Sequence, residues 1–148
     1  MKPVASILRL ARIGRQRRRL LAEAVFEVSL ASAMIALAPF RATVAFGARQ
    51  LGRVRPAHAE TATTIEQVRW SVEAAARRVP WRALCFEQGL ALQRMLRRRG
   101  VPAQLHYGLG KNDDGAIAAH VWVAADNAVA IGGEAAAGFA TVAIFPAH

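Results

Sequence analysis

One cysteine and one distant histidine are the residues in this chain best suited to covalent chemistry. Cys85 opens a helical pattern that runs as far as Pro102. At the first turn of a helix, free backbone N–H groups and the positive end of the dipole stabilise a thiolate, and the same groups can receive the oxyanion of an attacked carbonyl. His120 lies in a run of β-branched and small residues that ends in an Asp-Asn turn signal, which predicts a strand. A cysteine and a histidine that meet only after folding form the pattern of nucleophilic acyl transfer, although a lone cysteine is more often a small buried apolar residue.

The segment that carries Cys85 has the periodicity of an amphipathic helix. Cys85, Gly89, Leu92 and Leu96 follow one another at i, i+4, i+7 and i+11, which predicts one face for burial. We interpret the other face as a solvated or partner-facing surface. Its basic residues are Arg94, Arg97, Arg98 and Arg99. Gly100 suits the left-handed residue that ends a helix, and Pro102 prevents the helix from continuing.

After Pro102 the apolar pattern changes from a period of 3.6 to a period of 2, which predicts strands. The four predicted strands are Ala103 to Leu109, Ala116 to Ala125, Ala128 to Ile131 and Phe139 to Phe145. We expect them to form an antiparallel meander. A helix followed by a sheet predicts an α+β fold in which the helix packs on the sheet and presents Cys85 to the strand that carries His120.

A third catalytic group would be an acid that accepts a hydrogen bond from the histidine ring. Glu134 is the favoured acid, because a three-residue turn from Asp126 to Ala128 would place it opposite His120 on the next strand. A two-residue turn would place Gly133 there instead, but Gly132 and Gly133 can form a bulge that re-aims the side chain of Glu134. Asp126 is the alternative, but it lies six strand residues, or about 20 Å, from His120, so it is better interpreted as a turn residue.

With Lys111 to Gly115 as the hairpin loop, His106 would face His120 on the same side of the sheet. His106 is there either an ordinary strand residue or a border of the cleft.

The order of these motifs resembles a known family. It consists of Cys-Phe-Glu-Gln-Gly-Leu-Ala-Leu-Gln-Arg-Met-Leu-Arg-Arg-Arg-Gly-Val-Pro, then Ala-His-Val-Trp-Val, then Gly-Gly-Glu and a short C-terminal strand. Over residues 81–146 this order is similar to the transglutaminase-like leader peptidases of lasso peptide biosynthesis. The resemblance implies a papain-like or transglutaminase-like core with a Cys85, His120 and acid site, in which Glu134 stands where the family commonly has Asp. It also implies cleavage of the leader from a ribosomally made precursor peptide.

The resemblance further implies partners. The partners would be the lasso precursor peptide, a small leader-recognition protein and an ATP-dependent lasso cyclase. Four residues are assigned to substrate binding: Trp81, Gln88, His106 and Trp122. For Trp81, a place in the core over the helix is the first interpretation. A transglutaminase-like acyltransferase and a non-catalytic basic adaptor are the alternative functions.

Composition limits the remaining classes of protein. The chain has 148 residues, 54% of them hydrophobic, which is enough for one domain with a real core. One cysteine cannot form an internal disulfide, and no Cys/His spacing suits zinc, so we expect no metal or other cofactor and a reducing cytoplasm. The formal net charge is +10, but the basic clusters lack interleaved aromatic residues and any nucleic-acid motif, so nucleic-acid binding is not expected.

The N-terminal third reads as a basic helical region. Residues 1–20 contain seven basic residues and no acidic residue. An amphipathic helix is predicted from Leu20 to Ala38, ending at Pro39, with Glu23 and Glu27 on a different face from its apolar residues. Packing against the catalytic domain is the favoured role for this helix, ahead of binding to a membrane surface or to a protein partner.

A further helix is expected over residues 41–51, and another with Thr63 as its cap. The boundary between an N-terminal region, 1–55, and a catalytic domain, 56–148, is placed in the polar link that follows Leu51.

Overall fold

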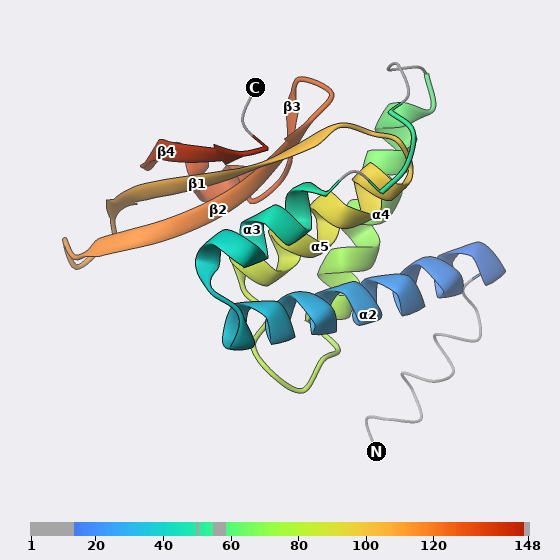
Figure 1. Ribbon diagram of the computed structural model, residues 1–148, viewed down its shortest axis with the longest axis horizontal. Helices are drawn as coiled ribbons and strands as arrows, with labels where there is room; N and C mark the ends of the chain where they lie inside the picture. The colour runs from blue at the N-terminus through green and yellow to red at the C-terminus, as the bar shows by residue number, and fades with distance from the viewer. Residues whose placement is uncertain (1–13, 50, 55–58, 147–148) are drawn as a thin grey trace.

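The computed structural model describes residues 14–49, 51–54 and 59–146. These residues form one four-stranded antiparallel sheet and five helices, which confirms the predicted α+β class. The helices are α2 (Arg15–Leu37), α3 (Phe40–Ala48), α4 (Thr61–Ala76), α5 (Cys85–Arg98) and α6 (Gly133–Ala136). The strands are β1 (Ala103–Lys111), β2 (Ile117–Ala125), β3 (Ala128–Ile131) and β4 (Phe139–Phe145). Helix α5 lies between the sheet and α2, so the molecule has a sheet layer, a middle helical layer and an outer helix (Figure 1).

The order of the strands differs from the predicted meander. The sheet runs β3-β2-β1-β4, so the last strand pairs with β1 and not with β3. The chain after β3 passes through α6 before it enters β4 on the opposite edge of the sheet. Strand periodicity indicates which residues form strands, but the choice of neighbour depends on a connection whose path the sequence does not encode locally.

Helix α5 is the centre of the core. Its predicted apolar face is confirmed, since Gly89, Leu92 and Leu96 are buried. A methyl group added to Gly89 would lie 3.0 Å from Cγ1 of Val121 on β2, so the absent side chain lets helix and sheet approach closely. The helix ends as predicted: Gly100 has φ +78°, and the N–H of Val101 donates to the carbonyl of Leu96 at 3.0 Å.

The arginine face of α5 pairs with α2 of the same chain, whereas the sequence predicts a solvated or partner-facing surface. The guanidinium of Arg94 is buried and donates from Nε to Oε2 of Glu27 on α2 at 2.8 Å. Arg98 donates to both Glu27 and Glu23, at 2.5 and 2.6 Å, and Arg99 donates to Glu23 at 2.6 Å. The carboxylates that neutralise these arginines come from α2 of the same chain, and they lie more than sixty residues away in sequence.

Helix α2 accordingly packs against the rest of the molecule. Its buried residues Leu21, Ala24 and Val28 belong to the same hydrophobic core as Leu105 and Val123 of the sheet, in line with the favoured packing role. It begins at Arg15, earlier than predicted, and ends before Pro39 as predicted. Glu27 lies on the buried side of α2, contrary to the polar-face assignment.

By length and composition, α2 meets the requirement for a membrane span, as core helices of globular domains also can. In this structure a third of its most apolar window is buried inside the protein, and its carboxylate Glu27 is fully buried in ion pairs with α5.

The other helices differ from the predicted limits by a few residues. Helix α3 starts at Phe40 and ends at Ala48, and α4 starts at Thr61, so Thr63 is inside the helix and does not cap it. Residues 1–13 of the predicted basic region and residues 55–58 of the predicted domain boundary lie outside the described residues.

The ion pairs of Glu23 make stability depend on pH. Its hydrogen bond with Arg99 holds the pKa of the Glu23 carboxyl below 4.5, and the charge of Arg99 and the contacts with Arg98 act in the same direction, whereas partial burial opposes them. The folded state therefore binds protons less readily than the unfolded state, so Glu23 stabilises the fold above about pH 4.5 and loses this effect as the pH falls through its folded pKa. We expect Glu23→Gln to lower the free energy of unfolding at pH 7. In urea titrations the difference from wild type should shrink steadily at pH values below 4.5, and a difference independent of pH would contradict this assignment.

Candidate active site

Cys85 is the first residue of α5, as predicted, and its side chain is half-buried. The preceding residue, Leu84, is extended, and its N–H donates to Oε2 of Glu87 at 3.1 Å, which fixes the first turn. The amide of Gln88 donates to the carbonyl of Ala83 at 2.9 Å. Gln88 therefore ties down the loop that leads into the nucleophile, while the N–H groups of the first turn have no acceptor within the helix.

The loop before Cys85 is also joined to α2. The indole Nε1 of Trp81 donates to Oγ of Ser32 at 2.9 Å, and the Trp81 side chain remains 42% exposed. Trp81 is therefore not a core aromatic residue that covers α5. It holds the 79–84 loop against α2 at the end of the molecule where Cys85 lies.

His120 lies on β2, opposite Gly108 of β1. The predicted pairing with His106 is wrong by two residues: His106 pairs with Trp122, because Lys111 joins β1 and the hairpin loop begins at Asn112. A shift of two residues preserves the face, so His106, Trp122 and His120 still project from the same side of the sheet. Trp122 stacks between the two histidines, with ring centroids 5.5 Å from His106 and 6.0 Å from His120.

The histidine ring has a backbone acceptor where an acid is predicted. Nε2 of His120 lies 2.8 Å from the carbonyl oxygen of Gly132, and because a carbonyl only accepts, the ring nitrogen donates. Gly132 has φ +80°, and a Cβ there would lie 2.8 Å from the carbonyl oxygen of Val121. Only glycine therefore fits at this position.

Glu134 does not lie on a strand opposite His120. The turn after β2 has two residues, Asp126 and Asn127, both with positive φ, so Ala125 pairs with Ala128 and not with Val129. Glu134 then falls in α6, where it is exposed and makes no ion pair or hydrogen bond with any described residue. Asp126 occupies the exposed turn, as expected for the alternative acid.

The predicted role of Glu134 as the third catalytic residue can be tested directly. We expect Glu134→Gln to leave the rate of any Cys85-dependent reaction within about twofold of the parent, because its carboxylate does not contact His120. The rate should be measured over a pH series, since loss of an acid that orients the histidine would change both the rate and its pH profile. A loss of a hundredfold or more would restore Glu134 as the third catalytic residue.

The structure places Cys85 and His120 on different sides of the sheet. Gly89, one turn after Cys85 on the same side of α5, contacts Val121, Val123 and Leu105. Adjacent strand residues point to opposite faces, so His120 projects away from the face on which α5 packs. Among the residues that the structure describes, no hydrogen bond joins the thiol of Cys85 to a histidine.

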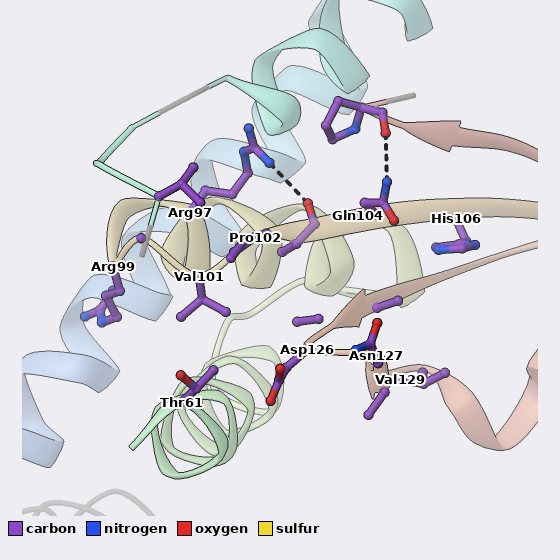
Figure 2. Close-up of a pocket in the computed structure, with 17 residues that line it drawn as sticks. Thr61, Arg97, Arg99, Val101, Pro102, Gln104, His106, Asp126, Asn127 and Val129 are labelled. Atoms are coloured by element: carbon purple, nitrogen blue, oxygen red, sulfur yellow. Dashed lines mark hydrogen bonds between the residues drawn. The ribbon is translucent and has the colours of Figure 1, made fainter. Parts of the chain in front are cut away.

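A groove lies at the other end of α5. Figure 2 shows that its walls come from the end of α5 and the start of β1 on one side and from the β2-β3 turn on the other, with Thr61 of α4 at its border. Its volume is about 840 Å³. The length of α5, roughly 20 Å for 14 residues, separates it from Cys85. Of the residues predicted for the site, His106 and the alternative acid Asp126 line this groove.

Within the described residues no group of three His, Cys, Asp or Glu side chains could hold a metal ion. Sequence reasoning did not find two features of the site. These are the Gly132 carbonyl and the aromatic residues that α3 brings close to α5. The Gly132-Gly133 pair indicated an unusual backbone, but not that the Gly132 carbonyl accepts a hydrogen bond from His120. Phe40 carries no local signal that relates it to Cys85.

The family comparison agrees with this architecture. A family model described as the transglutaminase-like superfamily matches residues 24–143, which extends from α2 into β4. The superfamily is typically composed of cysteine-dependent enzymes with protease-like or acyltransferase-like chemistry. Neither the curated proteins nor the solved structures gave a match.

Proposed function

The chain belongs to the transglutaminase-like superfamily, and from this premise we propose that it is a cysteine peptidase that removes the leader from a ribosomally made lasso peptide precursor. The motif order from Cys85 through His120 to the Gly-Gly-Glu segment supports the finer assignment. The observation that carries the proposal is the position of Cys85, half-buried and therefore within reach of a peptide, at the N-terminus of the helix around which the core is built.

The proposed reaction is a two-step acyl transfer. The Cys85 thiolate attacks the carbonyl at the junction of leader and core peptide, so a C–S bond forms and the carbonyl oxygen becomes an oxyanion. The N–H groups of the first turn of α5 receive that negative charge. The C–N bond then breaks, and the leaving amine takes a proton from His120. Water hydrolyses the thioester, which releases the leader carboxylate and restores the thiol.

His120 is proposed as the acid and base on the strength of its motif, not of a contact with Cys85. Its hydrogen bond to Gly132 occupies Nε2 and leaves Nδ1 as the nitrogen that exchanges protons in the neutral ring. The proposal therefore requires that Nδ1 reach the reacting groups when substrate is bound.

The proposed partners follow from the same motif order. They are the precursor, a leader-recognition protein that delivers it and a lasso cyclase that uses the freed amine, all in the cytoplasm. The basic N-terminal region is a candidate docking surface for one of them, because Arg15 to Arg19 include four exposed arginines at the start of α2.

The proposed function is tested by incubating the purified chain with synthetic precursor peptide and the delivery protein, followed by mass spectrometry. Hydrolysis leaves a free carboxylate on the leader, whereas a transglutaminase-like transferase would join the same acyl group to an amine. This second activity uses the same thiol, and the superfamily match favours it equally. Absence of both products would leave a non-catalytic role.

A further inference from the structure

Four aromatic residues from four different elements meet beside the start of α5. Phe40 at the start of α3 has ring centroids 5.9 Å from Phe86, 5.3 Å from Tyr107 and 5.9 Å from Phe145. We call Phe40, Phe86, Tyr107 and Phe145 the aromatic cluster. From these contacts we infer that Phe40 is a specificity-determining residue that selects an aromatic or aliphatic side chain next to the scissile carbonyl of a peptide. This role in peptide recognition rests on the function proposed above.

The aromatic cluster lies next to the nucleophile in the sequence and in the fold. Phe86 follows Cys85 directly. Tyr107 pairs with Val121, the residue against which Gly89 packs one helical turn after Cys85. Because α5 runs antiparallel to β1, moving back from Gly89 to Cys85 leads along the sheet toward Tyr107. A peptide whose scissile carbonyl reaches the N-terminus of α5 would therefore place the side chain next to that carbonyl against this cluster.

The cluster is only partly covered. Phe86, Tyr107 and Phe145 are half-buried, whereas Phe40 is 43% exposed, and Leu84 just before the nucleophile is 53% exposed. A phenylalanine that only filled the core would be enclosed, and exposed apolar surface beside a reactive group is typical of a binding site.

The chemistry of the cluster determines its occupant. None of its side chains carries a charge, and the Tyr107 hydroxyl is its single polar group. A charged side chain placed there would lose water without gaining an ionic partner, whereas an aromatic ring would gain edge or stacking contacts. The occupant is therefore an apolar residue of an extended peptide, with a ring preferred over a branched aliphatic chain.

Alkylation of the thiol tests this inference without requiring any hydrolysis. The chain contains one cysteine, so each modification reports on Cys85 alone. The thiolate adds to the double bond of a maleimide, the C–S bond forms, and the adjacent carbon takes a proton from water. The probes are N-benzylmaleimide and N-(2-hydroxyethyl)maleimide, and the measurement is the ratio of their second-order rate constants. Iodoacetamide, which is small, reports the intrinsic reactivity of the thiol.

We expect Phe40→Ala to lower the benzyl to hydroxyethyl ratio roughly threefold to tenfold while the iodoacetamide rate stays within twofold. Phe26→Ala is the matched control, because Phe26 is 62% exposed on α2 and no described ring contacts it. Phe40→Leu keeps an apolar side chain and should fall between wild type and Phe40→Ala. Thermal unfolding of each variant checks that the fold is retained.

Two outcomes would overturn the inference. One is an unchanged ratio in folded Phe40→Ala or Phe40→Leu, and the other is an equal fall in Phe26→Ala. Failure of the proposed function has a different signature. In that case the ratio falls as expected but neither wild type nor Phe40→Ala cleaves a precursor, so the cluster recognises apolar groups beside a thiol that serves another reaction.

Discussion

Cys85→Ala is expected to abolish release of the leader, with a fall in kcat/KM of roughly 10³-fold or more. The reason is that the thiol is the sole cysteine of the chain and lies at the first turn of the core helix, where no other nucleophile is placed to form the acyl intermediate. The measurement is single-turnover cleavage of precursor peptide followed by mass spectrometry. Cys85→Ser keeps the geometry but replaces the thiolate by a weaker nucleophile, so it should also lose most of the activity.

His120→Ala supplies the second arm of this experiment. A histidine that acts with Cys85 as one unit should cause a similar loss, and the double variant should be no slower than either single variant. This arm is informative because the described structure holds His120 on the sheet face away from α5. Full activity in His120→Ala together with none in Cys85→Ala would place the base elsewhere. Full activity in both would end the enzyme proposal.

The second large effect is on stability. Glu27→Ala is expected to lower the free energy of unfolding by about 3–5 kcal/mol, because it leaves the buried guanidinium of Arg94 without its carboxylate. Arg98 loses one of its two acidic partners in the same variant. Urea denaturation monitored by the tryptophan fluorescence would measure the change.

Two further variants show that this loss comes from an uncompensated buried charge. Glu66→Ala breaks an exposed ion pair with Arg69 on α4 and should cost no more than about 1 kcal/mol. Glu27→Leu combined with Arg94→Met removes both buried charges, so it should recover much of the stability that Glu27→Ala loses. If Glu27→Ala were as stable as Glu66→Ala, the Glu27–Arg94 ion pair would not be what holds α2 against α5.

The elements of the fold could largely be predicted from local patterns. The start of α5 at Cys85, the left-handed Gly100 after it, and strands β3 and β4 lie where periodicity and turn residues place them. Such signals depend on residues within one or two turns of each other, and the chain near α5 contains strong ones. Local patterns did not decide the pairing of β4 with β1, which depends on the path of the connection through α6. They also did not decide the length of the turn after β2, because a two-residue and a three-residue turn differ by only one residue of register.

The arginines of α5 illustrate the same limit in electrostatics. In the sequence they form a basic run that reads as a solvated face, and the opposing acids Glu23 and Glu27 read as the polar side of another helix. Packing α2 against α5 pairs these charges: Glu27 and Arg94 are buried together, whereas Arg98 and Glu23 remain partly exposed. No pattern within either helix encodes this pairing, because ion pairs of this kind depend on the distance between elements that are remote in sequence.

By itself the sequence determined the chemistry that is available: one thiol at a helix start, one histidine on a strand two residues before a tryptophan, and an order of motifs that matches a superfamily. Tertiary structure alone decided which groups surround them. It gave His120 a backbone acceptor in Gly132, moved Glu134 out to an exposed helix, and brought Phe40 beside Phe86. The physical reason is that residue type and helical or strand period are local properties, whereas strand register, the path of a connection and helix packing set the side-chain neighbours.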